Sequence, residues 1–215
     1  DAKNIMGTFT PPKEVHISTR LLQTLDEADV RSGVGEMLKV HAIEGPAAFA
    51  GISDDYDRLF TEQAVMMAYI RRSLEIKKAY IETDEFDQGP RNIFNYGHSF
   101  GHAIEAATNF GIPHGIGVTI GMDMANYVAA ESGVGSIETF ISRHDCLKRN
   151  YRTFEDYPVP VEPFLQALEK DKKNVGSDLV LILPDAEGKI RKTRRANDNA
   201  FRQLCATFLG QVRLA

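Results

Sequence analysis

Three of the six histidines in the chain lie in one short stretch, between residues 98 and 114. A helix is predicted from about Asn92 to Asn109, and spacings of 4, 3 and 4 residues place four polar side chains on one of its faces. These side chains are Arg91, Asn95, His98 and His102. Because a cationic and polar stripe of this kind is unfavourable to bury, it indicates a site for an anion or a metal ion.

The spacing of His98 and His102 is typical of metal-binding helices, since an i, i+4 pair can hold one ion from one side. Spacing alone nominates these two histidines and Glu105 as ligands. A solvated face with capping histidines is the alternative. Gly97 and Gly101 interrupt the predicted helix at about 1 kcal/mol each, which favours close approach of a ligand or of another backbone.

Composition excludes several classes of protein. The 215 residues include 43% hydrophobic and 26% charged side chains, values typical of a globular protein and not of a disordered one. A net charge of −5 disfavours a dedicated nucleic-acid binder, and no apolar run reaches the ~20 residues of a membrane helix. The two cysteines do not suggest a disulfide framework, and residues 1–6 do not resemble a signal peptide. We therefore expect a cytoplasmic protein without nucleic-acid or membrane partners.

The periodicity of apolar residues is mostly helical, so helices are expected to position the polar residues. Helices are predicted at about residues 28–43, 56–82, 92–109, 115–132, 136–149, 161–170 and 197–212. Leu179–Pro184 is predicted as a strand with Lys189–Thr193 as its antiparallel partner, and Glu14–Ser18 alternates like a further short strand. Glycines in the 115–132 helix indicate close packing against a neighbour. The predicted fold is mainly α with a small β-ribbon, and no dinucleotide-binding loop is recognisable.

A second cluster, Glu36 and Lys39, would by itself be interpreted as a surface ion pair on a helix. Its surroundings, however, resemble a known family. The matching motifs are Arg31-Ser32-Gly33-x-x-Glu36-x-x-Lys39, Lys77, Asp84-Glu85-x-Asp87-x-Gly89-x-Arg91-x-x-x-Asn95-x-Gly97-His98-Ser99-x-Gly101-His102-Ala103-Ile104-Glu105, His114-Gly115 and Asp171-Lys172-Lys173. In order and spacing they resemble 3-dehydroquinate synthase and the related sugar phosphate cyclases.

This resemblance implies a two-domain enzyme of which the chain corresponds to the second part. Residues 1–18 resemble a remnant of the N-terminal nucleotide-binding domain with its linker, and residues 19–215 resemble the helical, metal-binding catalytic domain. NAD would be bound by the N-terminal domain, whose glycine-rich loop this sequence lacks. The chain therefore looks like a piece of a longer protein. It is expected to be inactive by itself and to belong to a homodimer.

The resemblance also implies a divalent metal ion, usually zinc with cobalt as an alternative, held by Glu36, His98 and His114. Glu36 and His98 would come from different helices, and His114 from the loop after Pro113. His102 would bind phosphate, which contradicts the nomination from spacing alone. Three ligands from separate segments leave coordination positions open for a substrate, as a catalytic site requires.

Further polar residues acquire roles from the same resemblance. Those expected around the reacting hydroxyls and the substrate carboxylate are Lys39, Lys77, Asp87 and Arg91. Those expected to hold the phosphate, besides His102, are Asn4, Asn95 and Lys172 or Lys173. Asp87 stands where most 3-dehydroquinate synthases carry glutamate, which shortens a polar arm by one methylene.

The implied reaction is the phosphate-eliminating cyclisation of a seven-carbon keto-acid phosphate, catalysed by a carbon–oxygen lyase of the shikimate pathway to aromatic amino acids. NAD would oxidise one hydroxyl and later reduce it again, with loss of phosphate between the two steps and an aldol closure after them. One alternative is a cyclase for another ketose or heptulose phosphate. A second is a metal-dependent alcohol or glycerol-phosphate dehydrogenase, and a third is a non-catalytic metal-binding module.

Overall fold

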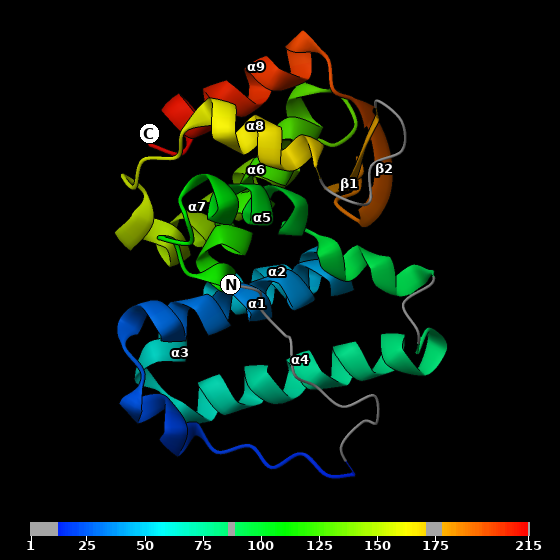
Figure 1. Ribbon diagram of the computed structural model, residues 1–215. Coiled ribbons are helices and arrows are strands. Elements are labelled where there is room, and N and C mark those ends of the chain that lie inside the picture. Colours follow the sequence, from blue (N-terminus) through cyan, green and yellow to red (C-terminus); the bar gives the residue numbers. More distant parts are fainter. Residues whose placement is uncertain (1–12, 86–88, 171–177, 215) are drawn as a thin grey trace.

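Helices and one two-stranded ribbon account for most of the chain (Figure 1). The computed structural model describes residues 13–85, 89–170 and 178–214. For these residues the expected mainly α fold with a small β-ribbon is confirmed. Four of the expected site residues lie outside the described residues, namely Asn4, Asp87, Lys172 and Lys173.

The lower half of Figure 1 is built from the first part of the described chain. It contains the 3-10 turn η1 (Thr19–Thr24) and the helices α1 (Glu27–Glu44), α2 (Pro46–Asp54), α3 (Arg58–Thr61) and α4 (Gln63–Thr83). Asp26 caps α1 by accepting a hydrogen bond from the backbone N–H of Asp29. The stretch predicted as one helix over 56–82 is divided, because the backbone of Glu62 is extended between α3 and α4.

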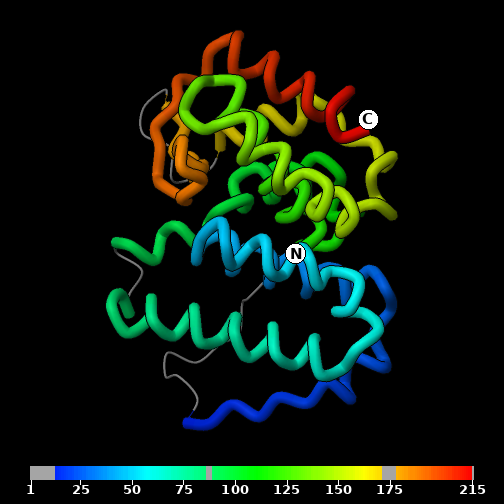
Figure 2. Tube along the Cα trace, turned by 180° about the vertical axis from the view of Figure 1, so that it is seen from behind, coloured from blue at the N-terminus to red at the C-terminus, as the bar shows by residue number. Residues whose placement is uncertain are grey.

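The upper half follows after the 3-10 turn η2 (Pro90–Asn95). It contains α5 (His98–Ala107), α6 (His114–Glu131), α7 (Ile137–Tyr151), the turn η3 (Arg152–Phe154), α8 (Val161–Glu169), β1 (Asp178–Pro184), β2 (Ile190–Ala196), α9 (Asn199–Thr207) and a π-helical turn at Phe208–Val212. The strands pair antiparallel, with Asp178 opposite Ala196 and Pro184 opposite Ile190. Seen from behind, the two halves lie one above the other (Figure 2). Among the described helices, none combines the length and the apolar content that a membrane crossing needs.

α6 is the central helix of the fold. Every residue from Gly115 to Ala129 is buried, and the helix packs against α1, α5, α7 and β1. Its sequence is apolar on nearly all sides, as a helix surrounded by protein requires. Asp123, a fully buried acid on this helix, accepts hydrogen bonds from two side chains of α7, the Tyr151 hydroxyl at 2.7 Å and His144 Nδ1 at 2.9 Å.

Glycines let α6 approach its neighbours at backbone distance. A Cβ at Gly115 would lie 1.9 Å from the carbonyl oxygen of Ser32 on α1, and a Cβ at Gly121 would lie 2.1 Å from that of Gly97. From the other side, a Cβ at Gly35 on α1 would lie 2.4 Å from the Gly115 carbonyl oxygen. The close packing predicted from the glycines of this helix is therefore confirmed, and it is closer than any side chain at these positions would permit.

The helix predicted over 92–109 is divided between η2 and α5. Gly97 lies between the two elements and takes a left-handed backbone conformation, φ 76°, which ends one helix and which glycine adopts without strain. The expectation that four polar side chains share one helical face is therefore wrong, because Arg91 and Asn95 lie on η2 and the two histidines on α5. The short strand expected at Glu14–Ser18 is also not formed.

Two glycines of α1 provide a matched test of the close packing. Gly35→Ala should lower the free energy of unfolding by about 1–3 kcal/mol or more. The added Cβ would lie 2.3 Å from Thr119 Oγ1, so α1 and α6 would have to separate. Gly33→Ala should raise the free energy of unfolding by up to about 1 kcal/mol through helix propensity. Its Cβ would meet no described atom of another element within 4 Å. Urea unfolding followed by circular dichroism measures both variants, and equal effects would contradict the packing.

Candidate metal centre

Three side chains of metal-ligand type converge from three helices. Glu36 lies in the middle of α1, while His98 and His114 are the first residues of α5 and α6. The Oε1 atom of Glu36 lies 3.7 Å from His98 Nε2 and also 3.7 Å from His114 Nε2. Glu36 and His98 thus come from different helices, as expected, but His114 starts a helix and is not part of the preceding loop.

In both imidazole rings Nδ1 contacts an oxygen atom of the protein, whereas Nε2 faces Glu36. His98 Nδ1 lies 3.2 Å from the carbonyl oxygen of Tyr96, and His114 Nδ1 lies 3.0 Å from Oε1 of Glu105. A carbonyl or carboxylate oxygen only accepts hydrogen bonds, so each contact is a hydrogen bond when the ring carries its proton on Nδ1. The lone pair of each Nε2 is then directed to the space next to Glu36.

The geometry of these atoms fits a metal ion. Oε1 of Glu36 is buried and has no hydrogen-bond partner among the described residues, which is unfavourable for a carboxylate oxygen unless a cation satisfies it. Ligand atoms at zinc-like bond lengths in a tetrahedral shell are about 3.4 Å apart. The observed 3.7 Å separations are close to that value. Glu36, His98 and His114 could therefore hold a divalent ion after a small contraction.

His102 is a fourth candidate in the same place. One ring nitrogen each of His98, His102 and His114 lie within 4.8 Å of one another. The rings of His102 and His114 are stacked, with centroids 5.7 Å apart, and His102 is exposed where the other two are partly buried. The structure thus brings all four expected residues together, and either Glu36 or His102 is close enough to be the third ligand beside His98 and His114.

Lys39 lies beside this cluster. Its Nζ donates to Glu36 Oε2 at 2.8 Å and lies 3.5 Å from His98 Nε2. Burial, aided by the charge of Lys39, lowers the pKa of His98 to about 3, so the ring is in the neutral form that binds metals. Burial by itself would raise the pKa of Glu36, but the ion pair with Lys39 holds it below its ordinary value and keeps the carboxylate charged.

A cationic pocket shares Lys39 with this cluster. It has a volume of about 180 Å³ and is lined by Lys39, Lys77, Ile81, Arg91 and Phe94. The aromatic ring of Phe94 packs edge-on against Tyr80 of α4, with centroids 5.1 Å apart, which holds η2 against that helix. The structure thus brings together three of the cations that the resemblance implied, from α1, α4 and η2.

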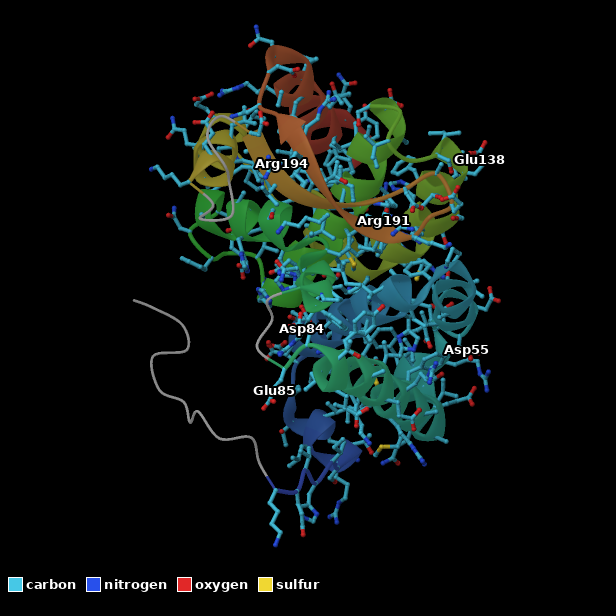
Figure 3. All side chains as sticks on the ribbon, turned by 90° about the vertical axis from the view of Figure 1, so that its right-hand side faces the viewer. Asp55, Asp84, Glu85, Glu138, Arg191 and Arg194 are labelled. Carbon is cyan, nitrogen blue, oxygen red and sulfur yellow. The ribbon has the colours of Figure 1, made fainter. Side chains whose placement is uncertain are left out.

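Asp84 fixes the backbone that carries Arg91, and no role was expected for it. Its Oδ2 accepts hydrogen bonds from the backbone N–H groups of Gly89 at 2.9 Å and Arg91 at 3.0 Å. The Arg91 guanidinium donates to the carbonyl oxygen of Glu85 at 2.8 Å. Figure 3 shows Asp84 and Glu85 next to each other where α4 ends. Asp84 begins one of the motifs that resemble the family, but the resemblance gave it no role, and an acidic residue ahead of a Gly-Pro turn is a pattern that many turns share.

Two further expected residues have contacts that the sequence did not indicate. Glu105, which spacing nominated as a metal ligand, lies within hydrogen-bond distance of His114 Nδ1, not of the Nε2 atom that faces Glu36. The side-chain amide of Asn95 donates to the carbonyl oxygen of Asn92 at 3.0 Å. Because Asn95 lies on η2 and His102 on α5, a shared helix does not place these two phosphate candidates side by side.

Solved structures that superpose on this chain include two cyclases. 2-Epi-5-epi-valiolone synthase from Streptomyces hygroscopicus, solved with NAD+ and Zn2+ bound, superposes with a TM-score of 0.81 at 21% identity, over 97% of this chain and 59% of that chain. 2-Deoxy-scyllo-inosose synthase, complexed with carbaglucose-6-phosphate, NAD+ and Co2+, superposes with a TM-score of 0.72 at 24% identity, over 95% and 58%. At these identities the likeness shows the fold.

Sequence comparison is more specific. The 3-dehydroquinate synthases of Dictyoglomus thermophilum and Alkaliphilus metalliredigens are each 33% identical over 192 residues, which cover 88% of this chain and 54% of each relative. The chain therefore spans about half the length of the curated relatives it matches. Residues 33–174 also match the family model described as 3-dehydroquinate synthase C-terminal. The chain belongs to the 3-dehydroquinate synthase family, and it corresponds to the C-terminal part of that family's proteins.

Proposed function

We propose that this chain is the metal-binding part of a 3-dehydroquinate synthase-like lyase that cyclises a seven-carbon keto-acid phosphate with loss of phosphate. The observation that supports this most strongly is the Oε1 atom of Glu36, which is buried and has no hydrogen-bond partner in the described part of the chain. It is equidistant from two Nε2 atoms and adjacent to a pocket of three cations. A metal ion next to clustered cations suits a substrate that carries hydroxyls, a carboxylate and a phosphate.

Glu36, His98 and His114 would hold the divalent ion, Zn2+ or Co2+. When bound, such an ion polarises a hydroxyl or carbonyl and lowers the pKa of the hydroxyl. Relatives with the same fold were solved with Zn2+ and with Co2+. His102 is exposed next to this triad and would bind phosphate instead of the metal. This choice leaves the charged carboxylate of Glu36 to offset the positive charge of the ion.

The cations would bind and orient the substrate. Arg91 would hold the carboxylate, because a guanidinium can donate two parallel hydrogen bonds to it. Lys39 and Lys77 would contact hydroxyl oxygens, and burial lowers the pKa of Lys39, which helps it to exchange a proton. For the phosphate we assign Asn4, Asn95, His102 and Lys172 or Lys173. Asp87 is assigned, with Lys39, Lys77 and Arg91, to the reacting hydroxyls and the substrate carboxylate.

NAD would be bound by the part of the protein that precedes this chain. Two relatives of the same fold were solved with NAD+, and the chain spans about half of the relatives it matches. The site would then lie between the two parts, with one wall supplied by each. A homodimer, a cytoplasmic location and a place in the shikimate pathway are what this function implies.

A cyclase for a different sugar phosphate is the second candidate. One relative of the same fold was solved with carbaglucose-6-phosphate, a ligand without a carboxylate. The presence of Arg91 in the cationic pocket favours the acidic substrate, because a neutral sugar ring would leave that guanidinium without an anion.

Arg91→Ala in the complete enzyme should distinguish the two substrates. Loss of a charge-assisted contact to a carboxylate should lower kcat/KM for the keto-acid phosphate by about 30- to 4,000-fold, equivalent to about 2–5 kcal/mol. Steady-state kinetics would measure this. Arg71→Ala is the matched control, because it removes the same charge from α4, where Arg71 is exposed and pairs with Glu75. Unchanged kinetics of the Arg91 variant with the acidic substrate would show that Arg91 does not bind the substrate carboxylate.

Without its partner domain the chain should neither turn over substrate nor bind NAD. The strands of the described residues form a two-stranded antiparallel ribbon, whereas a dinucleotide crevice of the Rossmann type needs a parallel sheet. Calorimetric titration of NAD into the purified chain should show no saturable heat. A micromolar Kd would contradict this assignment of the cofactor.

A further inference from the structure

Glu105 is a buried acid on the last turns of α5, outside the set of residues assigned above. It lies seven residues after His98, which is two helical turns along the same face. Its Oε1 lies 3.0 Å from Nδ1 of His114, and the side chain of Glu105 is only 6% exposed. The contact crosses the short connection from α5 to α6.

The position of the proton on His114 decides whether its Nε2 can bind a metal ion. A neutral imidazole carries one proton, and the nitrogen that carries it cannot also donate a lone pair. In water a free imidazole side chain favours the proton on Nε2. In this chain that proton would point at Glu36 Oε1, 3.7 Å away, and would form a competing interaction at the metal position. An acceptor at Nδ1 removes this competing state.

His98 has the same arrangement with a different acceptor. Its Nδ1 faces the backbone carbonyl of Tyr96 at 3.2 Å. The two histidines therefore present Nε2 to Glu36 for the same physical reason, but only in His114 is the acceptor a side chain that substitution can remove.

We propose that Glu105 is a positioning residue of the metal centre: its carboxylate holds the His114 proton on Nδ1 and fixes the ring, so that Nε2 is ready for the ion. This inference rests on the metal centre proposed above. The competing explanation is that Glu105 only clamps the connection between α5 and α6, where Asn109 and Phe110 have left-handed backbones. A clamp would affect stability, whereas a positioning residue also sets the tautomer and the metal affinity.

The first measurement reads the tautomer in the metal-free chain. Two-bond proton–nitrogen NMR correlation at pH 8 distinguishes the two neutral forms of each ring, and His114→Gln identifies the signals of His114. We expect the Nδ1–H form in the parent chain. In Glu105→Ala the proton should move largely to Nε2. In Glu105→Gln it should stay on Nδ1, because the amide oxygen can accept the same hydrogen bond.

The second measurement is the affinity for Zn2+ and Co2+, by competition with a chromophoric chelator. Glu105→Ala should lose about 10–100-fold, and Glu105→Gln should recover most of it. Asp123→Asn is the matched control, since it also changes a buried acid that holds a histidine through Nδ1, His144 at 2.9 Å on α7. That control should lower stability and leave the metal affinity unchanged.

The outcomes separate this inference from the function it rests on. A parent chain that binds neither metal overturns the metal centre and Glu105 with it. A parent chain that binds metal but carries the His114 proton on Nε2 overturns the role of Glu105 alone, and this holds even if Glu105→Ala does not fold. Retention of both the tautomer and the affinity in a folded Glu105→Ala variant would likewise show that Glu105 is only a clamp.

Discussion

The backbone N–H of Gly115 on α6 donates to the hydroxyl of Ser32 on α1 at 2.8 Å, at a point where a Cβ on Gly115 would lie 1.9 Å from the Ser32 carbonyl oxygen. Glu36 lies one helical turn after Ser32 on the same face of α1, and His114 directly precedes Gly115. The contact that brings these two helices together therefore also places a carboxylate and an imidazole 3.7 Å apart. The proposed metal centre therefore lies beside the close contact of α1 and α6, two helices that are far apart in the chain.

His98 is positioned in a similar way, by a close contact between two helices. Gly97 is the residue whose carbonyl oxygen faces Gly121 of α6, and His98 comes directly after it as the first residue of α5. Each histidine of the proposed triad is thus the neighbour of a glycine at a close helix contact. Because backbones this close allow little adjustment, the ligand atoms are positioned by the core and not by flexible loops. Preorganisation of this kind favours a catalytic site, since metal affinity depends on ligands that are already in place.

Elements with strong periodicity were predictable from sequence, and the irregular links between them were not. α1 is predicted at 28–43 and spans Glu27–Glu44. The ribbon predicted at 179–184 and 189–193 spans Asp178–Pro184 and Ile190–Ala196. The break at Gly97 was missed because its left-handed conformation depends on the packing of α6 over it, which local propensity does not encode. The burial of Lys39 was also not predictable. Its spacing from Glu36 suggests a surface ion pair, but neighbouring elements cover it and only 4% of it is exposed. The contact of Glu105 with His114 Nδ1, at 3.0 Å, crosses the α5–α6 connection, and spacing along a single helix does not reveal such a contact.

The central claim is that Glu36, His98 and His114 bind the metal ion and that His102 does not. Anomalous diffraction from crystals of the chain grown with Zn2+ or Co2+ would test it most directly. The account predicts an ion at about 2.0–2.2 Å from a Glu36 oxygen and from Nε2 of His98 and of His114, with His102 outside the coordination shell. An ion held by the three histidines without Glu36, or by His102 without His114, would contradict it.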